Sequence, residues 1–519
     1  MAQNKVIKVP LNRVEGDLEV RVEVKDGIVV DAWSAGMMYR GFENILVGRA
    51  PLDSLVITPR ICGICTTAHL SAAAVALDRL AAAEVPDDAR RLRNIAQMVE
   101  YIQSDVRHAF LLFAPDFANP AYQKQPLFEE AVARYTPFQG RLSREAIQVS
   151  KKALEIIAIL GGQWPHSSFM MPGGVVSRPG PSELLQCAAQ LAAYRRWYEE
   201  QVLGCSLERW AEVQSAADLE AWLEQDAAHF NSEMGFFLRF GRAIGLDQPV
   251  SGTNHFISYG NLEMPAQTAV RPLGADAAQF LPAGFASGPQ VEAFDQQHVV
   301  EHSAYSWFEG EEGGLHPFNG STRPYASGQE GKRYSWSKAP RYRGQPAETG
   351  PLAEMIVSGQ PLFVDLLRQR GATILLRQLA RLARPARMLP AMETWLNEMA
   401  ASAPKPGAYY IKPRPIESGE AFGLVEASRG ALGHWVKVKE GEITHYQIIT
   451  PTAWNGSPRD VDGRRGPWEE ALIGTPVRDP ENPVEIGHVI RSFDACLVCT
   501  VHTLDARQGR RTPLKRLRV

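Results

Sequence analysis

The sequence predicts an α+β fold that is mainly α-helical with small β elements, in which N- and C-terminal β-hairpins flank a long central helix bundle. Two observations predict it: apolar and polar residues alternate near both ends of the chain, and helical periodicity dominates between them. Hydrophobic residues make up 45% of the 519 residues and charged residues 22%, a composition that supports a large buried core. Because no stretch reads as a linker, we expect residues 1–502 to form a single domain.

Turn residues and the spacing of apolar residues indicate where the strands and helices lie. Residues 4–34 alternate around Lys25-Asp26-Gly27, and residues 433–449 alternate around Lys439-Glu440-Gly441, so each segment predicts a hairpin. Residues 309–351 show little periodicity, which is typical either of a functional segment or of an exposed loop. Apolar residues at steps of three and four predict a long one-sided helix over 88–113, with further helical stretches near 143–161, 181–212, 217–245 and 361–402.

The net charge and the N-terminal residues give no sign of a nucleic-acid-binding, exported or membrane-spanning chain. The net charge of −3 gives no reason to expect nucleic acid or an anionic membrane surface as the main partner. Residues 1–10 lack the pattern of a signal peptide, and no apolar run approaches the ~20 residues of a membrane span. We therefore expect a cytoplasmic chain with no transmembrane segment of its own, associated with the inner face of the membrane only through partners.

Four of the six cysteines lie in two Cys-x-x-Cys motifs at opposite ends of the chain. Cys62 and Cys65 are followed by His69, and Cys496 and Cys499 by His502. If the fold brings the motifs together, four thiolates converge, and such soft ligands select a soft or borderline metal. Structural zinc is the alternative, although zinc motifs usually gather their ligands within a few dozen residues. Six cysteines in so long a chain do not form a disulfide scaffold.

The residues around these motifs resemble the two signatures of the large, catalytic subunit of the nickel–iron hydrogenases. Arg60 precedes the first motif, and Asp494 precedes the second. Similar blocks follow in order along nearly the whole chain, among them Arg13-Val14-Glu15-Gly16, Pro165-His166, Lys338-Ala339-Pro340-Arg341-Tyr342 and Arg429-Gly430-Ala431-Leu432-Gly433-His434-Trp435. The resemblance implies heterolytic cleavage of H2 into protons and electrons, which pass to an iron–sulfur small subunit, and it is greatest for the cytosolic uptake type.

By this resemblance the four cysteines hold a nickel–iron centre. Cys62 and Cys496 are terminal ligands of nickel, while Cys65 and Cys499 bridge nickel and an iron that carries carbon monoxide and cyanide. Cys496 begins the proton exit, which continues to Glu15. A chain with no further cysteine motif cannot hold iron–sulfur clusters itself, since these need about four cysteines each.

Further residues surround the centre by the same resemblance. Arg429 lies over the open metal position and is held by Asp105 and Asp494 through charge-assisted hydrogen bonds. Ser428, where the family often has proline, offers a hydroxyl to an iron-bound cyanide. His69 donates a hydrogen bond to a bridging thiolate and so tunes the metal.

A second ion and a removable tail are also implied. Glu43, His502 and the main-chain carbonyl of Ile448 match the ligands of a magnesium-like ion, which prefers oxygen donors. Residues 503–519 form a basic extension that a maturation protease is expected to remove after His502; read alone, it would suit an acidic lipid surface or RNA. A higher oligomer of the heterodimer is a further expectation.

Simpler readings stand beside these. Glu15 can form a structural salt bridge with Arg13, and His166 is most simply a hydrogen-bonded core histidine. Cys187 and Cys205 are expected in the core. A hydrogen-sensing regulatory subunit and a zinc-binding scaffold of the same fold are the alternative functions. The related subunit of respiratory complex I is excluded because it lacks the metal cysteines.

Overall fold

The computed structural model of the chain describes residues 5–14, 16, 18–272, 278–310, 312–325, 331–401, 407–496 and 502–503, with the main chain alone at Pro10, His502 and Thr503. Its α-helices are α1 (Phe42–Leu46), α2 (Ser54–Ile57), α3 (Thr66–Leu80), α4 (Asp87–Arg107), α5 (Phe128–Tyr135), α6 (Arg141–Gly161), α7 (Pro181–Trp197), α8 (Leu207–Ala211), α9 (Ala216–Gln225), α10 (Ala227–Asn231), α11 (Glu233–Ala243), α12 (Pro351–Val357), α13 (Pro361–Arg370), α14 (Ile374–Ala400), α15 (Pro451–Asn455), α16 (Pro467–Leu472) and α17 (Val484–Ser492).

The strands form small antiparallel sheets. They are β1 (Lys5–Pro10), β2 (Leu18–Lys25), β3 (Ile28–Gly36), β4 (Tyr39–Arg40), β5 (Met170–Met171), β6 (Gly174–Val175), β7 (His255–Glu263), β8 (Gln279–Ser287), β9 (Gln290–Glu292), β10 (Val299–His302), β11 (Ala339–Tyr342), β12 (Gly419–Ala427), β13 (Gly430–Lys439), β14 (Glu442–Ile449) and β15 (His502–Thr503). The predicted α+β class is confirmed.

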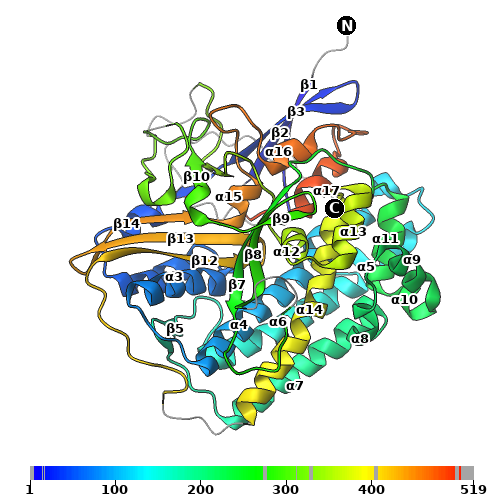
Figure 1. The fold of residues 1–519 in the computed structure, drawn as a ribbon. Coiled ribbons are helices and arrows are strands. Elements are labelled where there is room, and N and C mark those ends of the chain that lie inside the picture. The colour runs from blue at the N-terminus through cyan, green and yellow to red at the C-terminus, as the bar shows by residue number, and fades with distance from the viewer. Residues whose placement is uncertain are drawn as a thin grey trace.

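The predicted N-terminal and C-terminal hairpins are both present. β2 and β3 meet at the turn predicted at Lys25-Asp26-Gly27, and β1 adds a third strand. β13 and β14 form the C-terminal hairpin, and β12 extends it to the order β12-β13-β14. In Figure 1 the N-terminal sheet stands at the top of the molecule, and the C-terminal sheet lies across α3.

Helix α4 is the centre of the bundle. It confirms a long helix that begins near residue 88, but the prediction that this helix is one-sided is wrong, because most of its polar residues are buried as well. It is buried along 17 of its 21 residues and packs against α6, α14 and β7 (Figure 1). The α-helix ends at Arg107, and the chain continues as a π-helical turn, η3 (His108–Phe113). Because α4 is surrounded over most of its length, most of its polar residues face other parts of the protein, and several of them build the site described below.

Helix α3 lies against the C-terminal sheet at very short range. At Gly423 of β12, an added Cβ would lie 1.8 Å from the carbonyl oxygen of Ala72, so no larger residue fits there. The alanine-rich face of α3 permits this approach. The contact fixes the position of α3 relative to the C-terminal sheet. It therefore also places Cys65, which directly precedes α3, relative to the residues just before β13.

The sheet β7-β8-β9 was not predicted. Seven consecutive residues of β7, Phe256 to Leu262, are buried, because both faces of this strand are covered. A strand buried on both sides shows no alternation of apolar and polar residues, which was the only strand signal available.

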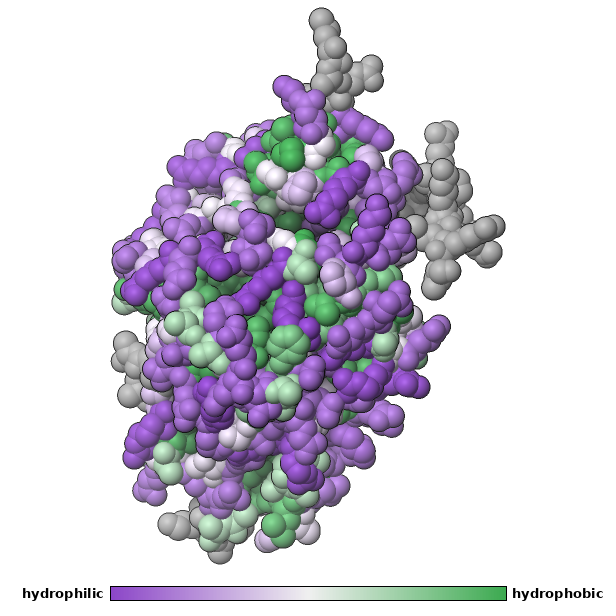
Figure 2. Space-filling view, turned by 90° about the vertical axis from the view of Figure 1, so that its right-hand side faces the viewer, coloured by the Kyte–Doolittle hydropathy of each residue, from purple (hydrophilic) through white to green (hydrophobic). Residues whose placement is uncertain are grey.

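The irregular segment predicted over 309–351 is confirmed in its described parts, where β11 and the 3-10 turn η8 (Pro317–Asn319) are the regular elements up to Gly350. The described helices include none that is long and apolar enough to cross a membrane. Figure 2 shows one face of the molecule, which is hydrophilic over most of its area with apolar side chains in small groups.

Candidate metal centre

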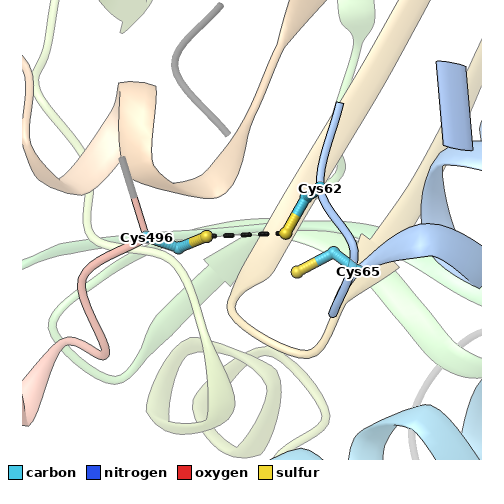
Figure 3. Close-up of side chains that lie close together, drawn as sticks. All are labelled: Cys62, Cys65 and Cys496. Carbon is cyan, nitrogen blue, oxygen red and sulfur yellow. Dashed lines mark hydrogen bonds between the residues drawn. The ribbon is translucent and has the colours of Figure 1, made fainter. Parts of the chain in front are cut away.

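Three cysteines from the two ends of the chain meet in the interior. The Sγ atoms of Cys62, Cys65 and Cys496 all lie within 4.8 Å of one another, and all three residues are buried. Figure 3 shows the first two on the segment that leads into α3 and the third on the segment after α17, with the sulfur atoms turned toward one another. In the described part of the chain, this is the one cluster of three or more metal-ligating side chains.

The spacing of the sulfur atoms fits a shared metal ion. The Sγ atoms of Cys62 and Cys496 are 3.7 Å apart. Sulfur atoms bound at ~2.3 Å to a common tetrahedral ion would lie about 3.8 Å apart, whereas a disulfide requires about 2.05 Å. The donor set is all thiolate, which suits a soft or borderline metal. Cys499, the fourth predicted ligand, lies outside the described residues.

The first motif is anchored to the central helix by a buried carboxylate. Glu100 of α4 accepts hydrogen bonds from the main-chain N–H groups of Thr67, at 2.7 Å, and Ala68, at 3.2 Å. These are free donors at the N-terminus of α3, which a carboxylate satisfies well. Burial raises the pKa of Glu100 to about 7, although these hydrogen bonds oppose the rise. Sequence reasoning missed this residue.

Arg429 lies beside the cysteines, as predicted. Its Nη1 is 3.1 Å from the Sγ atom of Cys65, and its Nη2 is 3.0 Å from Oδ1 of Asp494. Burial alone would lower the pKa of Arg429, but the carboxylate of Asp494 and the cysteine sulfurs raise it well above its ordinary value. Burial would likewise raise the pKa of Asp494, but Arg429, His108 and Arg381 outweigh it and lower the pKa to about 2. The pair is therefore charged at neutral pH.

The predicted contact between Asp105 and Arg429 is wrong. Asp105 instead binds two arginines of α14: Arg384 at 2.7 and 2.8 Å, and Arg381 at 3.1 Å. Arg381 also lies 3.1 Å from Oδ2 of Asp494. Arg381 and Asp494 thus connect Asp105 to Arg429.

Ser428 also departs from its predicted role. Its buried hydroxyl donates a hydrogen bond to the main-chain carbonyl of Glu100, at 3.1 Å. A serine hydroxyl has one proton to donate, so in this arrangement it is not available to a cyanide ligand.

His69 is fully enclosed and belongs to a chain of buried polar groups. Its Nδ1 lies 3.1 Å from Nε2 of His434, whose Nδ1 lies 3.0 Å from the hydroxyl of Tyr446. Burial lowers the pKa of His69 to about 3 and that of His434 well below its ordinary value, so both rings are neutral at pH 7. The predicted donation from His69 to a bridging thiolate stays a prediction.

The three residues proposed for a magnesium-like ion come from one region. Oε1 of Glu43 accepts from the N–H of Ile448, at 2.8 Å, and from Gln447, while Oε2 accepts from the hydroxyl of Thr322. In an antiparallel strand the N–H and C=O of one residue point to the same side, so the Ile448 carbonyl is on the Glu43 side. The main chain of His502 pairs with Arg40, three residues before Glu43. The donor set of carboxylate and carbonyl fits a hard cation.

Glu15, the expected proton acceptor after Cys496, lies outside the described residues. Its neighbour Arg13 forms an ion pair with Asp116, which also pairs with Arg491 at 2.5 Å. Arg13 therefore has a structural carboxylate partner other than Glu15.

Of the three residues expected in the core, only Cys187 is fully buried. His166 is half-buried, and its Nδ1 lies 3.0 Å from the carbonyl oxygen of Pro59, so the expected hydrogen bond is present. Cys187 is buried, and its pKa is raised to about 12 by burial. Cys205 is partly buried and accepts a hydrogen bond from the indole of Trp222.

Arg381, Arg384 and His434 are the main residues of the site that the sequence did not reveal. His434 lies in the block of residues 429–435 that resembles the family, but the sequence indicated no role for it. The two arginines, together with Arg377, follow helical spacing in an otherwise apolar segment, and this signal could have identified them.

The sequence matches the family model described as nickel-dependent hydrogenase over residues 40–132 and 143–502. The periplasmic NiFeSe hydrogenase large subunit of Desulfomicrobium baculatum is 34% identical, with 96% of this chain and 95% of that protein covered. The uptake hydrogenase large subunit of Rhodobacter capsulatus is 29% identical, with 99% and 98% covered.

Two solved structures are also similar to this chain in fold. The H2-activated NiFeSe hydrogenase of Dm. baculatum superposes with a TM-score of 0.80 at 32% identity, covering 96% of this chain and all of that chain. The reduced Ni-Fe-Se hydrogenase of D. vulgaris Hildenborough gives a TM-score of 0.78, also at 32% identity, with 96% of this chain and 100% of that chain covered. With the family model covering most of its length and three signature cysteines meeting inside it, this chain belongs to the nickel-dependent hydrogenase family as a large, catalytic subunit.

Proposed function

We propose that this chain holds a nickel–iron centre on Cys62, Cys65, Cys496 and Cys499 and cleaves H2 heterolytically. The observation that carries the proposal is the buried cluster of three sulfur atoms within 4.8 Å, with the Arg429 guanidinium 3.1 Å from one of them.

The chemistry divides between the centre and the chain. When bound, the nickel–iron centre, with carbon monoxide and cyanide on iron, supplies the electrophile and the electron acceptor for an apolar substrate. Charge develops when H2 is split, so fixed charges around it act most strongly in a site that excludes water. Arg429 provides a fixed positive charge, because Asp494 holds it and keeps it protonated.

The proton is proposed to leave through this chain's own groups. The thiolate of Cys496 is the proposed base at the start of the exit, with Glu15 as the next acceptor. General acid–base transfer requires such a relay to be within hydrogen-bond reach, directly or through one water. His69 stays neutral and hydrogen-bonded to His434, and so orients a ligand rather than carrying the proton away.

Further components complete the proposal. An iron–sulfur small subunit receives the electrons, with uptake as the working direction. A magnesium ion is held by Glu43, Ile448 and His502. Residues 1–502 form the mature domain, and a protease removes 503–519. Assembly into a higher oligomer and a cytoplasmic location stay predictions; the D. baculatum relative is named periplasmic. A hydrogen-sensing role is the alternative.

Metal analysis and activity test the proposal together. The chain, purified anaerobically with its partner from its native host, is expected to contain nickel and iron. It is also expected to reduce a viologen dye under H2 and to show the infrared bands of metal-bound carbon monoxide and cyanide. Zinc without nickel, and no dye reduction, would support the scaffold and reject the enzyme.

A further inference from the structure

One face of helix α14 carries three buried arginines. Each of them contacts either the residues just before Cys496 or the residue just before Arg429. Arg377, Arg381 and Arg384 follow spacings of four and three residues, so they share a face, and their side chains are at most 3% exposed. Arg377 lies over the ring of Phe493, and Arg384 donates to the carbonyl of Ser428 at 2.7 Å. The neighbouring Gln378 donates to the carbonyl of Ser492.

Arg381 is placed at the middle of this face, between two carboxylates. Its Nη1 is 3.1 Å from Oδ1 of Asp105 and 3.1 Å from Oδ2 of Asp494. Asp494 is thereby held on both sides, since its other oxygen pairs with Arg429. Removal of Arg381 would leave Oδ2 of Asp494 without a facing cation while Oδ1 keeps Arg429, so we expect the carboxylate to be held less firmly.

The carboxylate of Asp494 is held by ion pairs and not by well-aligned hydrogen bonds. Both of its arginine contacts are within ion-pair distance, yet neither oxygen accepts a well-aligned hydrogen bond from a described residue. A carboxylate held by charge alone is free to rotate unless a cation faces each oxygen. Arg429 faces one oxygen, and Arg381 faces the other.

We propose that Arg381 is a positioning residue for hydrogen cleavage: it holds Asp494 so that Asp494 in turn holds Arg429 against Cys65. The inference rests on the proposed function and adds a residue to it. The predicted direct tie from Asp105 to Arg429 is thereby replaced by a tie through α14. Because the effect comes from charge, lysine should substitute for Arg381, whereas a neutral side chain of similar length should not.

The test compares Arg381→Lys and Arg381→Gln in the assembled enzyme, with Arg341→Gln as the matched control. Arg341 is also fully buried and pairs with an aspartate, Asp460, at 2.7 Å, but it is not part of the site. The measurements are the infrared bands of the iron ligands, kcat and KM for H2, and amide hydrogen exchange of residues 492–496 in metal-free chain.

For R381Q we expect shifted or broadened infrared bands, faster exchange at 492–496, and kcat lowered about 10- to 100-fold with KM for H2 within about twofold. R381K keeps the positive charge between the two carboxylates, so it is expected within about threefold of wild type, with the wild-type bands; R341Q is expected with unchanged bands. A loss of stability alone would not separate kcat from KM or lysine from glutamine.

Several results would overturn the inference: unchanged bands and kcat in R381Q, or equal impairment of R381K and R381Q. Arg381→Met replaces R381Q if that variant does not accumulate. Failure of both neutral variants beside normal R381K and R341Q would make Arg381 a general stability element and also reject the positioning role. Wild-type protein without nickel or these bands would contradict the proposed function itself, whereas wild-type bands with an unchanged R381Q would contradict only this inference.

Discussion

The Nδ1 atom of His69 lies 3.1 Å from the Nε2 atom of His434, and both rings are buried. Because both are neutral, a single proton lies between these two nitrogens, and its position determines the tautomer of His69. If His434 donates, then Nε2 of His69 carries its own proton and can donate to a thiolate. Tyr446 is placed to accept or donate at the far end of the chain.

His434→Phe removes the group that fixes this tautomer. We expect nickel to be retained and kcat for H2 oxidation to fall about 10- to 100-fold, as for other partners of metal ligands. Steady-state kinetics and infrared spectra of the iron ligands provide the measurements. His445→Phe is the control, because this half-buried histidine of the neighbouring strand β14 bonds to the carbonyl of Pro317 in the turn η8. Wild-type kcat and bands in His434→Phe would show that the tautomer is set elsewhere.

Cys62→Ser should abolish nickel binding, because a hydroxyl is a hard, protonated and poor ligand for this metal. Elemental analysis of the purified protein is expected to show nickel lowered by more than ~10-fold. Cys187→Ala is the matched control: Cys187 is buried within the core, away from the cluster, and its loss should leave the nickel content unchanged. Equal nickel in both variants would remove Cys62 from the ligand set.

Because of Glu469, the free energy of unfolding should decrease as the pH rises. This buried carboxyl accepts from the N–H of Ser34 and the hydroxyl of Tyr334, and burial raises its pKa to about 7. Between the unfolded pKa near 4.3 and the folded pKa, the unfolded chain releases the proton first, so stability falls with pH. The loss at pH 8 relative to pH 5 is about 2 kcal/mol.

Glu469→Gln has no proton to release and tests this directly. Denaturant unfolding of variant and wild type at pH 5 and pH 8 should show the variant gaining about 2 kcal/mol relative to wild type at the higher pH. A difference between the two proteins that is the same at both pH values would mean that Glu469 is ionised throughout.

Active, nickel-loaded protein is expected to end at His502. The family match ends at this residue, and its main chain pairs with β4 near Glu43. Intact mass spectrometry should give the mass of residues 1–502 for wild type and the full-length mass for Cys62→Ser, which cannot load the metal. A full-length chain in active enzyme would contradict removal of the extension.

The parts of the fold with a strong local pattern could be predicted from sequence. The turn at Lys25-Asp26-Gly27 and the apolar repeat of α4 depend only on neighbouring residues, and both are present. Strand β7 carries no such pattern, because both of its faces are covered by other parts of the fold. Its burial is a property of the assembled protein.

The site shows the same division. The cysteines could be assigned because their spacing and chemistry are distinctive, although 434 positions separate Cys62 from Cys496. Asp105 was assigned to the wrong arginine, because neighbouring helix positions point about 100° apart and several buried arginines compete for one carboxylate. The choice between Arg429 and the pair on α14 depends on packing between distant helices.

The meeting of Cys62 with Cys496 also sets an order of events during synthesis. At roughly 5–20 residues per second, the second motif leaves the ribosome about 20–90 s after the first. Until then the nascent chain contains only one of the two Cys-x-x-Cys motifs, and the helix that carries Arg381 is itself translated late. A metal site that needs both motifs therefore cannot be completed before the second motif is made, and the early thiols need protection from competing cellular metals during that interval.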